Sequence, residues 1–181
     1  MRVYMKRAVA IAVVICATTL TANTGAGGDP YANIPAGKRE ILKTRLSEYV
    51  DNSRTRNWGK LYDLVSDTGR GGINRDGFID RMKQAHGVSF ANYPDLLQFV
   101  PARADKSEDG GFDLYGCAEA RREGEEYKGI AVVHAVYERE SWFFTGWSFD
   151  GMASGSCSAL KKADWQPFTR LRWNHIMEEL R

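Results

Sequence analysis

The chain has 181 residues, of which 43% are hydrophobic, and its 25 basic and 23 acidic residues give a formal net charge of +2. This length and composition suffice for one domain with one core, and the chain contains neither an internal repeat nor a long low-complexity tract. The first 28 residues hold three basic residues and no acidic one, so the remaining chain has a formal charge of −1. It therefore lacks the basic footprint of a nucleic-acid-binding protein.

The N-terminus has the organisation of a secretory signal peptide. Basic residues precede an apolar run over residues 8–20, and small residues follow. A stable membrane-spanning helix needs about 20 apolar residues, so an uncleaved anchor is the weaker interpretation. We expect residues 1–22 to be removed on export to the periplasm or the medium, with cleavage after Ala22 or Ala26 equally open. No stable membrane span is expected after cleavage.

Three helices are predicted in the next part of the chain. Residues 23–35 are rich in Gly, Pro and Asn, which predicts a flexible lead-in. From residue 36 apolar residues recur at helical spacing, and the stretch NWGKLYDLVSD (57–67) repeats that spacing in a short second helix. The glycine-rich stretch 66–72 is predicted to be a turn. Asn74 can cap a third helix that ends at Gly87.

After Pro94 the hydrophobic period changes from that of a helix to that of a strand. Alternating residues predict strands near 97–104, over 112–123, over 129–140 and over 141–149. The sequence EDGG (108–111) is a hairpin signal, and GEEYKG (124–129) predicts a second turn. Three helices followed by an antiparallel meander predict an α+β domain with helices on one face of the sheet.

The C-terminal extension, residues 150–181, follows the last predicted strand. Pro167 suits the first position of a helix, and Trp173, Ile176, Met177 and Leu180 form an apolar stripe, so we expect a helix that docks on the domain or on a partner. Cys117 and Cys157 remain after signal cleavage. In an oxidising compartment such a pair predicts a disulfide, with two buried free thiols as the alternative.

The order of these elements resembles the nuclear transport factor 2-like (SnoaL-like) superfamily. The resemblance rests on a long first helix, the NWGKLYDLVSD helix, the NRDGFIDRM helix and a sheet that ends in WFFTGWSF. It covers residues 36–149. It implies a cone-shaped fold, in which a curved antiparallel sheet wraps three N-terminal helices and leaves a pocket, and it does not imply a particular reaction. Dimerisation through the sheet is common in that superfamily. A second copy of the chain, bound through the sheet face, is therefore one of the partners that the resemblance implies.

Within the expected pocket we single out a few side chains. His134 shares a strand face with apolar residues, and Tyr115 and Glu119 share a face of the preceding strand, so the three are candidate catalytic residues if the register brings them together. The alternatives for His134 are a core histidine with one hydrogen bond, and a histidine on the outer face of the sheet. The expected pocket-lining residues are Trp58, Tyr62, Tyr115, His134 and Phe144.

No spacing in the sequence predicts a metal site or a cofactor. NRDGFID (74–80) matches only the middle of a calcium loop, because it lacks the first carboxylate and the final Glu, and GRGG (69–72) lacks the Lys of a phosphate loop. The leading hypothesis is an exported domain that binds an apolar small molecule or a protein without catalysis. The alternatives are a lyase or isomerase that uses His134 with Tyr115 or Glu119, and a structural subunit of an envelope complex.

Overall fold

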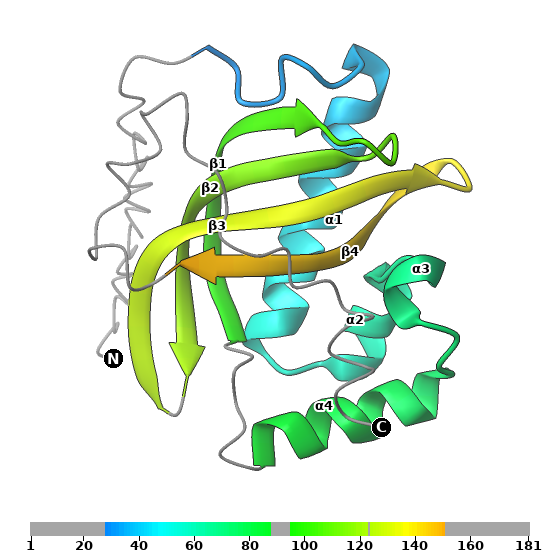
Figure 1. Cartoon of the computed structure of the whole chain (residues 1–181), viewed down its shortest axis with the longest axis vertical. Coiled ribbons are helices and arrows are strands. Elements are labelled where there is room, and N and C mark those ends of the chain that lie inside the picture. Colours follow the sequence, from blue (N-terminus) through cyan, green and yellow to red (C-terminus); the bar gives the residue numbers. More distant parts are fainter. Residues whose placement is uncertain (1–27, 88–94, 123, 151–181) are drawn as a thin grey trace, which may run out of the picture.

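The computed structural model describes residues 28–87, 95–122 and 124–150 of the chain. In this part, helices pack on one face of a four-stranded antiparallel sheet (Figure 1). The predicted α+β class is thereby confirmed. The predicted signal peptide (1–22) and the C-terminal helix within 150–181 lie outside the described residues.

The three predicted helices are present near their expected positions. Helix α1 spans Ala36–Arg54 and buries Leu42, Leu46 and Tyr49 along one stripe. Helix α2 spans Trp58–Leu64 and starts at Asn57, whose side chain accepts a hydrogen bond from the Lys60 N–H at 3.4 Å. Helix α4 spans Arg75–Gly87. As predicted, Asn74 caps α4, with Oδ1 accepting from the Gly77 N–H at 2.9 Å.

The stretch predicted to be a turn over residues 66–72 contains a further short helix, α3 (Asp67–Arg70), so the prediction was wrong there. Ser66 Oγ caps it by accepting the Gly69 N–H at 2.9 Å. Gly71 ends it with φ 58°, a left-handed conformation that favours glycine. A helix of a single turn is too short to produce a hydrophobic period, and its start and stop signals resemble those of a turn.

The sheet is a simple meander with strand order β1-β2-β3-β4. The strands span Asp95–Lys106, Phe112–Arg122, Glu125–Glu138 and Ser141–Asp150. The predicted hairpin at 108–111 is confirmed, since the Ser107 N–H donates to the Gly111 carbonyl at 2.9 Å. The predicted turn over 124–129 is shorter than expected, because residues 125–128 pair with residues 119–122 and belong to the strands. Backbone pairing extends this hairpin past the point where the apolar alternation ends.

The two faces of the sheet have different surroundings. The inner face packs against the helices in the main hydrophobic core, to which it contributes Leu114, Ala118, Ala131, Val133, Ala135 and Phe144. Helix α1 is fastened to this face by Tyr49, whose ring centroid lies 4.5 Å from that of Phe144, and by Trp142, whose Nε1 donates to the Lys38 carbonyl at 2.9 Å. Side chains at alternate positions, including Tyr115, Ile130 and Val132, point to the other face, which we call the outer face.

The segment from Gly28 to Pro35, expected to be part of a flexible lead-in, is packed against the domain. Tyr31 and Ile34 belong to the core. Arg39 of α1 donates hydrogen bonds to the Ile34 carbonyl at 2.8 Å and to Asp29 Oδ2 at 3.0 Å. Glycine and proline content predicted a loop, and the buried aromatic and aliphatic side chains hold that loop in place.

Candidate functional site

His134 lies on β3 and points to the outer face of the sheet. Its chain neighbours Val133 and Ala135 are in the helix-side core, so the imidazole lies on the opposite side from the helices. The side chain is buried. The sequence predicted an enclosed environment for His134, and its side chain is buried on the face of the sheet that points away from the helices.

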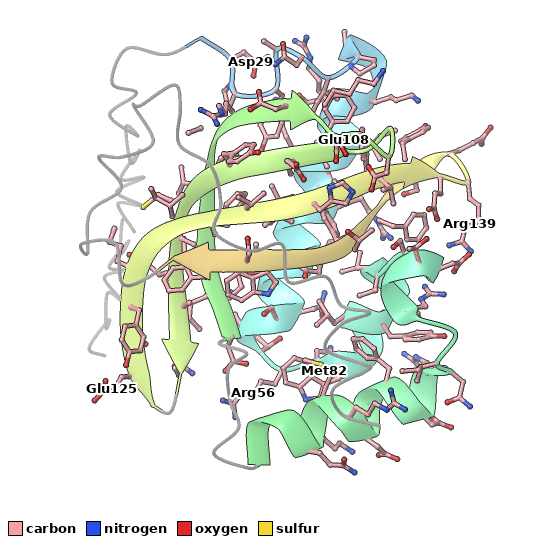
Figure 2. All side chains as sticks on the ribbon, viewed as in Figure 1. Asp29, Arg56, Met82, Glu108, Glu125 and Arg139 are labelled. Atoms are coloured by element: carbon pink, nitrogen blue, oxygen red, sulfur yellow. The ribbon has the colours of Figure 1, made fainter. Side chains whose placement is uncertain are left out.

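Two aspartates, rather than the expected Tyr and Glu, lie against this imidazole. Asp113 stands directly across from His134 in the β2–β3 register, and its Oδ1 is 2.6 Å from Nδ1. Asp109, in the β1–β2 hairpin, has its Oδ2 3.0 Å from Nε2. Gly111 leaves room for the ring, since a Cβ at that position would lie 3.0 Å from Nε2. The three side chains form a cluster, which we call the His134 cluster, near the hairpin that contains Glu108 (Figure 2).

Tyr115 and Glu119 share the outer face with His134 but have other partners. Tyr115 stands opposite Val132, and the guanidinium of Arg103 lies 4.4 Å from the centre of its ring. Glu119 stands opposite Lys128 and pairs with its Nζ at 2.9 Å. Lys128 is six positions from His134, about 20 Å at ~3.3 Å per residue. Glu119 therefore lies toward the Glu125 end of the sheet, away from the His134 cluster.

The His134 cluster has the arrangement of a buried Asp–His pair, in which the carboxylate fixes the orientation of the ring. The remaining ring nitrogen, Nε2, is the atom that would exchange a proton with a substrate. Nε2 has no accessible surface, and the Asp109 carboxylate lies against it. A substrate would reach Nε2 only after the hairpin around Asp109 had moved. This geometry stabilises the end of the sheet more readily than it supports proton transfer.

The other expected pocket residues, Trp58, Tyr62 and Phe144, lie on the helix side. Trp58 and Phe144 are buried members of the core. The Tyr62 hydroxyl donates to the Ile73 carbonyl at 3.2 Å, and its ring packs edge-on against Phe78 with centroids 5.5 Å apart. The NWGKLYDLVSD segment thus packs the helical layer, and Trp58 and Tyr62 do not line the groove described next.

A groove of about 620 Å³ runs between α1 and β1. Its walls contain none of the five residues expected to line a pocket. The apolar part of the lining comes from the N-terminal segment, from α1 and from β1, and consists of Tyr31, Leu46, Val50, Leu97, Phe99 and Pro101. This groove is the candidate binding site.

The charged residues of this groove are balanced in sign. Three are basic and three acidic: Lys43, Arg54, Arg121, Asp51, Glu119 and Glu126. Most have ion-pair partners: Arg54 pairs with Asp51 at 2.7 Å and Arg121 with Glu126 at 3.4 Å. The groove therefore combines an apolar floor with a rim of paired charges.

Tyr31 is an aromatic residue of the groove lining, and its hydroxyl group has a raised pKa. Burial, together with the negative charges of Asp29 and Glu40, raises the pKa of Tyr31 from 10.0 to about 12. Lys43 Nζ lies 5.4 Å from the centre of the Tyr31 ring. The phenol is thus neutral over the physiological range and presents an aromatic surface to the groove.

Sequence reasoning missed most of the groove because its residues come from five separate parts of the chain: the N-terminal segment, α1, β1, β2 and β3. Leu46 and Val50 were recognised as one apolar stripe of a helix, and Leu97 and Phe99 as a strand. Because β1 is the edge strand, the apolar stripe of α1 beside it stays partly open. Which strand lies at the edge is decided by the strand order. Asp113 could have been found, because it is the polar residue that stands opposite His134 once the hairpin register is fixed.

Within residues 28–87, 95–122 and 124–150, no group of three His, Cys, Asp or Glu side chains is arranged to hold a metal ion. None of the helices described there is both long and apolar enough to span a bilayer. Comparison of the chain with models of protein families, with curated proteins and with solved structures gives no match.

Proposed function

We propose that this domain is a non-catalytic binding module that holds a small molecule in the groove between α1 and β1. The observation that carries the proposal is the groove itself. Its volume of about 620 Å³ falls within the ~300–1,000 Å³ typical of small-molecule sites. Leu46 and Phe99 are buried at its floor, and the half-buried Val50, Leu97 and Pro101 supply the apolar surface that a ligand would contact.

The lining also limits the chemistry of the ligand. An apolar body would contact Val50, Leu97 and Pro101, and polar ends would face the charged rim. Because the rim contains equal numbers of basic and acidic residues, it offers no net field that would concentrate a polyanion or a polycation. We therefore infer an amphipathic organic ligand of low net charge.

The absence of catalysis in this proposal has a geometric basis. The three candidate catalytic residues do not surround one cavity, since Glu119 lies on the groove while His134 is held by two aspartates at the other end of the sheet. An acid–base reaction needs its groups within hydrogen-bond reach of one substrate. A lyase or isomerase built from His134, Tyr115 and Glu119 is disfavoured for this reason.

We also propose that the chain is an exported member of the nuclear transport factor 2-like superfamily. The helix-then-meander order and the curvature of the sheet around α1 support this assignment (Figure 1). The signal-peptide pattern of residues 1–22 supports export. The groove lies at the open edge of β1, so the proposed site differs in position from the central pocket that the superfamily implies.

The test is native mass spectrometry of the full chain purified from its natural host, followed by extraction and identification of any bound compound. We expect one class of amphipathic compound at near-stoichiometric amount. Val50→Asp introduces a charge on the groove wall and should reduce the bound fraction at least tenfold. Ile41→Asp is the matched control, because Ile41 is an exposed residue of the same helix and does not line the groove.

Circular dichroism should show that both variants are folded. A wild-type protein that carries no compound would refute the proposal. So would equal retention in Val50→Asp and Ile41→Asp, because the ligand would then lie elsewhere.

A further inference from the structure

The outer face of the sheet is apolar at its centre and buried there. Tyr115, Ile130 and Val132 are 6%, 1% and 3% exposed. None of the three belongs to the helix-side core cluster, since the register points them away from α1. The burial of this patch is therefore not explained by the described helices.

One row of paired residues crosses this face and links the patch to the end of the described chain. Cys117 of β2 pairs with Ile130 of β3, and Ile130 pairs with Asp150, the last residue of β4. Adjacent strands are ~4.8 Å apart, so the Cα atoms of Cys117 and Asp150 are separated by about 10 Å. Cys117 shares the outer face with Ile130 because paired residues point to the same side.

Cys157 follows Asp150 by seven positions. Seven residues can span up to about 24 Å, more than twice the separation across the row. A chain that leaves β4 at Asp150 can therefore return over the outer face and bring Cys157 to Cys117. The Cα atoms of a disulfide are about 5.5 Å apart, a distance that this length of chain can reach without strain.

We propose that residues 151–181 cover the outer face of the sheet and are fastened there by a Cys117–Cys157 disulfide. In forming the bond, the two thiols lose two protons and two electrons to a disulfide-bonded oxidant, such as a dithiol–disulfide oxidoreductase, which is reduced to its dithiol. The loop closed by this bond contains about 40 residues, which in the chain-entropy model makes the unfolded state less favourable.

The composition of the segment supports it as the occupant. It contributes Trp165, Phe168 and Trp173, aromatic residues of the kind that cover an apolar sheet face. A second copy of the chain is the main competitor. The segment continues directly from the end of β4 at Asp150, and Cys157 follows only seven positions later. The segment therefore has a far higher local concentration at this face than another molecule would have. The assignment is independent of the proposed ligand, because it concerns the outer face and its covalent link.

The covalent part is tested by tryptic digestion, without reduction, of the full chain recovered from an oxidising compartment. We expect one disulfide-linked species that joins peptides 107–121 and 140–161, and we expect it in the monomer fraction. Cys117 linked to peptide 8–38, which contains Cys16, would overturn the proposal. A free Cys117 thiol, or the 107–121 and 140–161 pair found only in covalent dimers, would overturn it as well.

The covering is tested by hydroxyl-radical labelling of Tyr115 in the full chain. Charges are placed in the segment by the triple variant Trp165→Asp, Phe168→Asp and Trp173→Asp. Labelling of Tyr115 should rise several-fold in this variant. Tyr127, which is 36% exposed on β3, is the internal control and should not change.

Unchanged labelling of Tyr115 would refute covering by this segment. Sedimentation of wild type as a dimer, with Tyr115 labelling that rises on dilution, would assign the face to a second copy instead. A negative result for the disulfide or for the labelling of Tyr115 would not affect the test of ligand retention in the groove. That test depends on Val50 and Ile41 rather than on Cys157.

Discussion

His134 and Asp113 face each other across β2 and β3, with Nδ1 and Oδ1 2.6 Å apart, and both side chains are almost fully buried. A hydrogen bond of this length between an imidazole and a carboxylate is charge-assisted and stronger than a neutral one. The pair lies where the β1–β2 hairpin returns, so it connects the hairpin to the centre of the sheet.

We therefore expect His134→Ala to reduce the free energy of unfolding by about 2–4 kcal/mol, because the variant loses a buried hydrogen bond to a charged group and creates a cavity. The control is Asp109→Ala, whose side chain is 37% exposed. It should cost less than about 1 kcal/mol. Urea unfolding followed by circular dichroism measures both values. A cost for His134→Ala no larger than that for Asp109→Ala would show that the pair contributes little.

Gly116 is predicted to be intolerant of any side chain. A Cβ there would lie 2.4 Å from the Val100 carbonyl oxygen and 2.6 Å from a ring carbon of Phe99, so β1 would have to shift. Gly116→Ala should cost about 2–3 kcal/mol, in the range of overpacked cores. Thermal unfolding should show a drop of many degrees. An unchanged melting temperature would mean that β1 yields easily at this point.

Gly37→Ala is the matched substitution with the opposite expected sign. Gly37 lies in the first turn of α1, and a Cβ there meets nothing within 4 Å. The alanine should stabilise the protein by about 0.5 kcal/mol through helix propensity and a less flexible unfolded chain. The same thermal unfolding experiment measures it. A loss of stability would contradict the open environment of this position.

Arg56 forms an ion pair that differs from the surface pairs nearby. Its Nε and Nη2 lie 2.9 and 2.8 Å from Oδ2 of Asp95, whose side chain is fully buried at the start of β1. Arg56→Ala should reduce stability by about 2 kcal/mol or more, because the buried carboxylate loses its cationic partner. Arg54→Ala is the control, since the Arg54–Asp51 pair is more than half exposed on both sides and should contribute under about 0.5 kcal/mol. Equal effects in urea unfolding would contradict this distinction.

The raised pKa of Tyr31 predicts a specific pH dependence. A folded-state pKa of about 12 against 10.0 means that the folded protein holds the phenolic proton more tightly than the unfolded chain does. The stability that this residue contributes is complete below pH 10 and is lost as pH rises from 10 to 12. Tyr31→Phe cannot ionise, so the stability difference between wild type and variant should shift in favour of the variant across that interval. A difference independent of pH would indicate an ordinary pKa.

Local sequence signals were sufficient for most of the secondary structure. The apolar stripe of α1, the Asn74 cap and the EDGG hairpin each depend on residues close together in the chain, and each was found where predicted. Errors occurred where local signals were ambiguous. The α3 turn of helix resembles a loop in sequence, and the charged end of the β2–β3 hairpin resembles a turn.

The candidate sites depended on the tertiary structure. The sequence indicated that His134 would be enclosed, and strand register decided that Asp113, rather than Tyr115 or Glu119, would contact it. The groove needed the position of β1 at the sheet edge beside α1. Hydrophobic period and capping act within a few residues and can be recognised in one segment at a time. Register and strand order are set by contacts between distant segments, and a single sequence does not specify them in advance.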